Sequence, residues 1–183
     1  MSMLRAMCVL ACLLLGSSAR AMISVPPDTG MPGGQVIYEG AVVYAPCTLS
    51  TESTNQIVRM GQFRTDQFSG KGSWVGVQPF TIALQNCEPT VLKTVGVMFN
   101  GAADTSDPLV FAVDGNGGAA TGIGLGIFDD KGELLPPNTR PQHLTDLRYG
   151  DMALSFMAKY RATSATPTSG KADANINFIL IYQ

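Results

Sequence analysis

The residue types that carry covalent or metal chemistry are few in this sequence of 183 residues. There are four cysteines, Cys8, Cys12, Cys47 and Cys87, and one histidine, His143. A zinc site needs three or four cysteine, histidine or carboxylate ligands, and His143 has no cysteine near it in the sequence. The cysteines therefore point to a disulfide rather than to a metal centre, and no cofactor is expected.

Residues 1–21 have the three parts of a secretory signal peptide. Arg5 supplies the positive charge, the stretch AMCVLACLLLG is apolar, and Ala19 and Ala21 occupy the small-residue positions of a cleavage site. The apolar stretch is short for a membrane span, and a retained anchor is the alternative. Cleavage after Ala21 predicts an exported mature chain.

Cleavage removes Cys8 and Cys12 and leaves Cys47 and Cys87. Two cysteines in an exported protein predict one disulfide, and two free thiols are the alternative. The bond would close a loop of about 40 residues, which stabilises the fold by about 4 kcal/mol on the chain-entropy account.

Four further features could suggest a catalytic or ligand site, and each has a simpler structural explanation. Asp129 and Asp130 stand in a predicted turn, where aspartate bonds to nearby backbone N–H groups. The stretch GIGLG at 122–126 resembles part of a phosphate-binding loop but lacks a lysine and a following helix, so it predicts a strand and turn. Trp74 is expected in the core or at a sheet edge rather than on a ligand, and His143 in an exposed loop. No nucleophile pairs with a base, so no enzymatic activity is predicted.

The charge of the chain argues against two further classes of function. Without Arg5 and Arg20, 10 of the 12 basic residues remain against 14 acidic ones, a net charge of −4. The basic residues form no cluster, so neither nucleic acid nor an anionic membrane surface is an expected partner. No segment after the signal has the length and apolar character of a transmembrane helix.

Period-two alternation of apolar residues predicts an all-β protein. The alternating segments are separated by glycine, proline, asparagine and aspartate, and no segment keeps a helical period, although residues 53–63 could hold a short helical turn. A hairpin is expected around Asp130–Gly132. Strands are expected within 33–47, 79–87, 94–99, 108–118, 122–136, 151–162 and 170–183. Short strands with this punctuation predict a β-sandwich.

Cys87 is out of phase with the strand that carries it. Phe80, Ile82 and Leu84 share one face, whereas Cys87 has the opposite parity. Either a bulge near Asn86 shifts the phase, or the disulfide lies at the margin of the sheet.

The two ends of the mature chain differ from the rest. The C-terminal strand is strongly apolar on one face, and no later strand covers it. Its inward face is predicted to consist of Ala172, Ala174, Ile176, Phe178, Leu180 and Tyr182. Residues 22–34 contain three prolines and three glycines and predict an extended arm before the domain. Both features fit a sandwich that is one strand short and receives that strand from another chain, which is an established mode of recognition.

The mature chain closely resembles the subunits of type 1-like fimbriae, which are built by the chaperone–usher route. The stretch GGQVIYEGAVVYAPC resembles the donor arm of that family running into its first cysteine, with Gly40 at the characteristic glycine. The spacing of Cys47 and Cys87 is also that of the family. The stretch AKYRATSATPTSGKADANINFILIYQ is similar to the family's C-terminus, with Gly170 fourteenth from the end and Tyr182 penultimate. The proline-bearing start of the arm, residues 22–30, departs from the family pattern.

The resemblance implies an incomplete immunoglobulin-like β-sandwich that lacks its last strand and is completed by a donor strand from a neighbouring subunit. It divides the chain into a signal peptide (1–21), a donor-strand extension (22–43) and a pilin domain (44–183). The donor residues would be Val36, Tyr38, Gly40 and Val42. Gly40 would lie over a shallow place in the neighbour's groove, the alternative being a kink between arm and domain.

The resemblance also implies the partners. A periplasmic chaperone would lend a strand along the C-terminal segment, and at the outer-membrane usher the arm of the next subunit would replace it. The product would be a fimbrium on the cell surface that supports adhesion. The residues implied to line the receiving groove are Gly170, Ala174, Ile176, Phe178, Leu180 and Tyr182.

Three classes of function are consistent with export, and a structural polymer subunit is favoured among them. A tip adhesin with its own receptor pocket would need a second domain, for which about 160 mature residues leave no room. An exported enzyme would need a catalytic site, and the residues suggest none. The sequence leaves open whether the subunit belongs to the shaft or is a minor adaptor or terminator.

Overall fold

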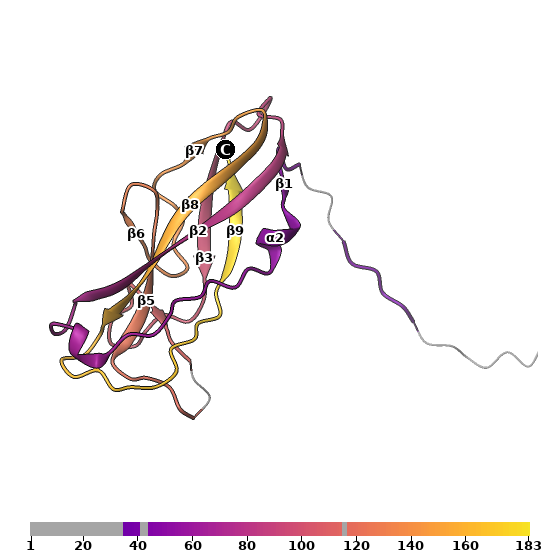
Figure 1. Ribbon diagram of the computed structural model, residues 1–183. Coiled ribbons are helices and arrows are strands. Elements are labelled where there is room, and N and C mark those ends of the chain that lie inside the picture. Colours follow the sequence, from indigo (N-terminus) through magenta and orange to yellow (C-terminus); the bar gives the residue numbers. More distant parts are fainter. Residues whose placement is uncertain (1–34, 41–43, 115–116) are drawn as a thin grey trace, which may run out of the picture. The chain divides into compact units, whose positions relative to one another are not determined.

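The computed structural model describes residues 35–40, 44–114 and 117–183. By its contacts the chain divides between Ala41 and Val42. The expected signal peptide, residues 22–34 of the arm, and Val42 lie outside the described residues. The described part of the second unit is all-β apart from two short helical turns (Figure 1).

The strands that the structure describes form two antiparallel sheets (Figure 1). The first sheet has the order β1-β2-β8-β5-β4, and β6 also pairs with β5. The second sheet has the order β7-β3-β9. The strands are β1 (Thr48–Leu49), β2 (Trp74–Cys87), β3 (Thr94–Asn100), β4 (Phe111–Ala112), β5 (Ile123–Phe128), β6 (Leu134–Leu135), β7 (Thr145–Asp146), β8 (Gly150–Ala162) and β9 (Asn177–Tyr182). The helical turns are α2 (Thr51–Thr54) and η1 (Thr65–Gln67).

The two sheets pack face to face through three phenylalanines. Phe80 of β2 and Phe156 of β8 are register partners in the first sheet, and their rings stack at 5.4 Å. Phe99 of β3 meets both rings edge-on, at 6.2 Å and 5.2 Å between centroids. Phe80, Phe99 and Phe156 lie on the inward faces of their strands, where alternate residues pack into the core, as the period-two pattern predicted.

The phase shift at Cys87 is a β-bulge, the first of the two alternatives. The pairing of β2 with β8 slips between Leu84 and Cys87, and Asn86 adopts a positive φ of 50°. The extra residue turns Cys87 into the core, where it is 1% exposed and bonded to Cys47. The predicted disulfide is therefore present.

The predicted hairpin after β5 is also present. β5 pairs with β6, and Asp129 accepts hydrogen bonds at its Oδ1 from the N–H groups of Lys131 (3.0 Å) and Glu133 (2.7 Å). Asp129 therefore has the turn role that the sequence favoured.

The segment 108–118 forms less strand than its pattern predicted. Only Phe111–Ala112 pairs with β5, and Leu109 is 47% exposed instead of sharing the buried face of Phe111. Val110 is buried in its place and lies over Gly124, where a Cβ would come within 2.4 Å of Val110 Cγ2.

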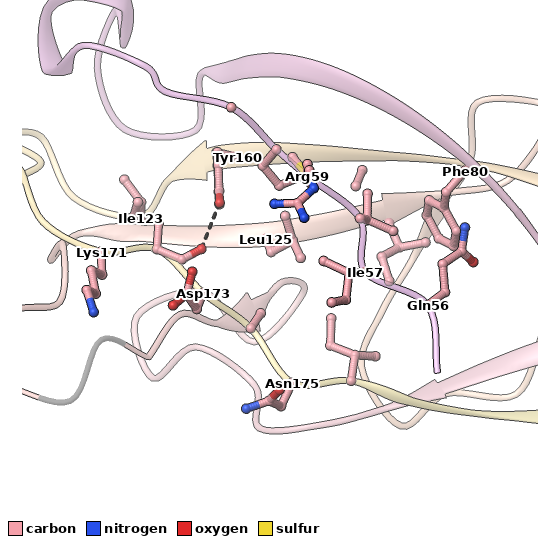
Figure 2. A pocket seen from close by; sticks show the side chains of 18 of the residues that line it. Gln56, Ile57, Arg59, Phe80, Ile123, Leu125, Tyr160, Lys171, Asp173 and Asn175 are labelled. Atoms are coloured by element: carbon pink, nitrogen blue, oxygen red, sulfur yellow. Dashed lines mark hydrogen bonds between the residues drawn. The ribbon is translucent and has the colours of Figure 1, made fainter. Parts of the chain in front are cut away.

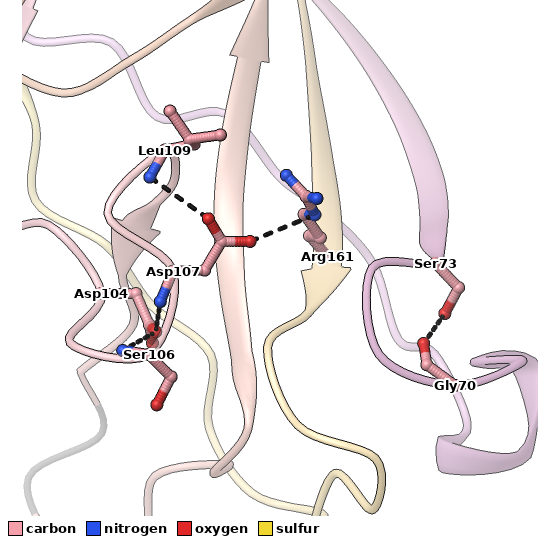
Figure 3. Close-up of polar contacts among 7 residues, drawn as sticks. All are labelled: Gly70, Ser73, Asp104, Ser106, Asp107, Leu109 and Arg161. Carbon is pink, nitrogen blue, oxygen red and sulfur yellow. Dashed lines mark hydrogen bonds and ion pairs between the residues drawn. The ribbon is translucent and has the colours of Figure 1, made fainter.

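A capped loop before β4 explains this difference (Figure 3). The Asp104 carboxylate accepts hydrogen bonds from the N–H groups of Ser106 and Asp107, at 2.8 and 3.0 Å. Asp107 in turn accepts from the N–H of Leu109 and pairs with Arg161 of β8 at 3.2 Å. These bonds fix the loop against the first sheet and set the phase of β4.

The short helical turn that residues 53–63 could have held is present only at its start. The helix α2 ends at Thr54, after a Ser50 N-cap whose hydroxyl accepts the N–H of Ser53. Residues 55–63 contain no helix.

We predict that Cys47→Ser lowers the free energy of unfolding by about 2–5 kcal/mol, the usual cost of removing a native disulfide from a small exported domain. The measurement is urea unfolding of the purified mature protein. The comparison is Ser50→Ala, which removes the cap of α2 and the Ser50 bond to Ser53 Oγ and should cost about 0.5–2 kcal/mol. Equal stability of the Cys47→Ser and native proteins would show that the bond contributes nothing to the fold.

Candidate functional site: an open groove beside the C-terminal strand

An apolar groove of about 1470 Å³ opens between the two sheets (Figure 2). Its floor comes from the inward faces of the first sheet and from β3. The floor residues are Phe80, Ile82, Phe99, Ile123, Leu125, Ile127, Ala158 and Tyr160. These residues belong to the hydrophobic core, so the groove is a length of core that no strand of the described chain covers.

One wall of the groove is the C-terminal segment. Every second residue from Ala172 to Tyr182 packs against the core, while Lys171, Asp173 and Asn175 between them face solvent. Residues 167–178 line the groove, and Leu180 and Tyr182 pack on the core beyond its end. Regular pairing begins only at Asn177, where β9 joins β3.

The opposite wall is the extended segment 55–63, which sequence reasoning missed. None of its backbone groups has a backbone partner among the described residues. Val58 and Met60 are its half-buried positions. Phe63 anchors the segment, because its ring covers Gly76, where a Cβ would lie within 2.3 Å of the ring, and meets Tyr160 edge-on.

Two backbone edges thus face each other across an apolar floor. β9 is the last strand of its sheet and pairs only with β3 in the described chain. The segment 55–63 offers a second unpaired edge. A strand inserted between them could form hydrogen bonds on both sides and place alternate side chains on the floor.

The start of the C-terminal wall, residues 171–173, is hydrogen-bonded to the loop 114–120 of the same chain. Lys171 bonds through its O to Ala120 N and through its N to Gly118 O, each at 2.8 Å. Asp173 exchanges two backbone bonds with Asp114, at 2.7 and 3.2 Å. These hydrogen bonds hold this end of the wall in place without a second protein chain.

Gly170, which the resemblance placed in the groove, lines it and also permits this pairing. A Cβ at residue 170 would lie 2.3 Å from Ala120 N and 2.4 Å from Ala119 C, both backbone atoms. Only glycine lets the two backbones approach this closely.

A tyrosine links the floor to the wall (Figure 2). The Tyr160 hydroxyl donates to the carbonyl oxygen of Ala172 at 2.7 Å. Burial, with a smaller contribution from the charge of Asp173, raises the pKa of Tyr160 above its usual value. Burial also raises the pKa of Tyr182. Both phenols are therefore protonated at neutral pH, and of the two only the Tyr160 hydroxyl has a hydrogen-bond partner among the described residues.

The other candidate residues do not assemble into a site. His143 is exposed in the loop before β7 and pairs with Glu133 at 2.7 Å. Trp74 packs edge-on against Phe128 at 4.9 Å, and residues 122–126 run into β5. Among the described residues, no three His, Cys, Asp or Glu side chains are grouped to hold a metal ion, and no helix is long and apolar enough to cross a membrane.

The described part of the arm, residues 35–40, forms no strand. Val36 and Tyr38 are 70% and 91% exposed, and nothing lies within 4 Å of a Cβ built at Gly40. Val36, Tyr38 and Gly40 lie on the face that the sequence assigned to a donor strand, and the side chains of Val36 and Tyr38 are largely exposed in the described part of the chain.

Comparison with known sequences identifies the family. The profile of the family described as "Fimbrial protein" matches residues 36–183, so the chain belongs to that family. It is 36% identical over 176 residues to "Fimbrial subunit type 1" of Salmonella typhimurium, covering 93% of this chain and 94% of that protein. It is 38% identical over 167 residues to "Long polar fimbria protein A" of the same species, covering 91% and 93%.

Solved structures agree with this assignment. A type I fimbria protein of Burkholderia pseudomallei matches with a TM-score of 0.59 and 34% identity, over 76% of this chain and 91% of that one. The P pilus rod subunit PapA matches with a TM-score of 0.64 and 26% identity, over 76% and 100%. The fold is thus the immunoglobulin-like sandwich of pilus subunits.

We predict that Gly170→Ala lowers the free energy of unfolding by about 1–3 kcal/mol, because the new Cβ forces the backbones of 170 and 119–120 apart. Urea unfolding of the mature protein measures the loss. Ser169→Ala, at the exposed neighbouring position, is the control and should stay close to the native stability. A Gly170→Ala variant as stable as that control would contradict the close approach.

Proposed function

We propose that the protein is a structural subunit of a chaperone–usher fimbria that polymerises by accepting a neighbour's arm in its groove and donating its own. The observation that carries the proposal is the groove with an unpaired backbone edge on each side. The family assignment and the fimbrial relatives support it, because they match nearly the whole chain rather than one part of it.

The arm has the chemistry that the groove requires. Val36, Tyr38 and Val42 would bury apolar side chains at about 1.5–3 kcal/mol each, and the added backbone hydrogen bonds would contribute further. An open groove of this size otherwise favours aggregation. We therefore infer that a periplasmic chaperone lends a strand first, and that the arm of the next subunit replaces it at an outer-membrane usher.

The arm's role is tested by Gly40→Leu. We expect the variant to fold and to bind its chaperone, because no atom of the described residues lies within 4 Å of a Cβ built at Gly40. It should fail to enter a neighbour's groove, because the glycine face meets a place too shallow for a side chain, so fibres should be absent or short by electron microscopy.

Glu39→Leu adds the same side chain to the opposite face and should leave fibres normal. Deleting residues 22–27, which precede the alternating stretch, should also have little effect. Fibres of normal length from Gly40→Leu would contradict the donor role of this face.

The wall's role is tested by Phe178→Asp. Phe178 lines the groove and lies 6.5 Å from the Phe99 ring, so a carboxylate there would be desolvated by an inserted strand. We expect the variant to lose co-purification with its co-expressed chaperone. The control is Ile179→Asp, whose side chain is exposed on the same strand. Equal chaperone yields for the two variants would show that the groove is not the site of capture.

A further inference from the structure

The backbone groups of the C-terminal wall alternate in direction. Gln183 and Thr94 exchange two backbone hydrogen bonds, at 2.9 and 3.0 Å, so the odd residues of β9 bond toward β3. In an antiparallel ladder the intervening residues point the other way. The backbone N–H and C=O groups of Phe178, Leu180 and Tyr182 therefore face the open edge.

The same parity continues below β9. Lys171 and Asp173 are odd-numbered like the residues of β9 that bond to β3, and they form their backbone bonds with the loop 114–120. Because burial alternates without interruption from residue 171 to residue 178, we expect the backbone groups of Ala172, Ala174 and Ile176 to face the open edge. An incoming strand would meet a row of backbone N–H and C=O groups from residue 172 to residue 182. One residue in this row is an exception, because its carbonyl already accepts a hydrogen bond.

That exception is Ala172. Its carbonyl accepts the Tyr160 hydroxyl at 2.7 Å. Tyr160 is only 7% exposed, and it stands between Leu125, its register partner on β5, and the ring of Phe63. Displacing the bond would leave a buried hydroxyl without a partner, at a cost of about 1–3 kcal/mol.

We propose that Tyr160 is a positioning residue that ends the ladder of an inserted strand, so that the strand pairs with the wall from Ala174 to Tyr182 and not with Ala172. This inference rests on the proposed function. The remaining edge spans about 27 Å, and the alternating stretch Val36–Val42 of the arm spans about 20 Å. The arm therefore fits within the edge that Tyr160 leaves free.

The test uses the mature protein and a synthetic peptide of residues 31–44, labelled with ¹⁵N and long enough to pass the stop. NOEs between peptide and wall fix the register, and amide exchange reports which peptide N–H groups are bonded. In the native complex we expect protection to end at the peptide residue opposite Ala174. In the Tyr160→Phe complex the Ala172 carbonyl is free, and the next peptide amide should gain up to about tenfold protection, the effect of one hydrogen bond.

The matched control is Tyr149→Phe, which removes an exposed hydroxyl outside the groove and should give the native pattern. If Tyr160→Phe does not fold, the native complex alone decides, because the amide opposite Ala172 must exchange freely there. Protection of that amide in the native complex, or identical patterns in the native and Tyr160→Phe complexes, would overturn the inference while leaving the groove's role intact. Failure of the peptide to bind at all would refute the acceptor role and this inference together.

Discussion

The structure depends on one constraint, which is that two facing backbone edges of the described chain lack a partner. The second sheet has β9 at its margin, and across the groove the segment 55–63 has no backbone partner in the described chain. Between them lies a floor of core residues that no strand of the described chain covers. Buried sheet edges and apolar floors are both unfavourable when left open, and a single added strand satisfies both at once.

The groove is built before anything enters it. The start of its C-terminal wall is hydrogen-bonded to the loop 114–120, and the end of that wall is hydrogen-bonded through Gln183 to Thr94. The floor is held by the long β2–β8 ladder and by the disulfide at one end of β2. Since these parts are fixed within one chain, binding has mainly to order the incoming strand, and preorganisation of this kind strengthens association by lowering its entropic cost.

Local patterns in the sequence were enough to predict the apolar face of the C-terminal segment but gave no sign of the opposite wall. The six alternating residues of the C-terminal segment carry a strong period-two signal, and the two cysteines predicted their own bond. The segment 55–63 has only Val58 and Met60 as half-buried positions, and its place is set by Phe63 packing over Gly76, a contact between residues 13 apart. The Tyr160–Ala172 bond joins a side chain to a backbone carbonyl, for which no residue pattern exists. The position of Cys87 in the alternating pattern showed that it is out of phase with Phe80, Ile82 and Leu84. That pattern could not distinguish a bulge near Asn86 from a disulfide at the margin of the sheet.

Alternating apolar side chains choose the face of a strand but do not fix its register. A slip by two residues keeps the same face on the floor, and apolar contacts are not directional, so several registers would bury similar areas. A unique register needs features that a shift of two residues would violate. Gly40, which interrupts a row of larger side chains in the arm, is a steric feature of this kind. The Ala172 carbonyl, which already accepts a hydrogen bond from the buried Tyr160 hydroxyl, is a polar one. A polymer of identical joints requires the same register at every joint, and a polar group in a site whose binding energy is otherwise apolar would meet that requirement.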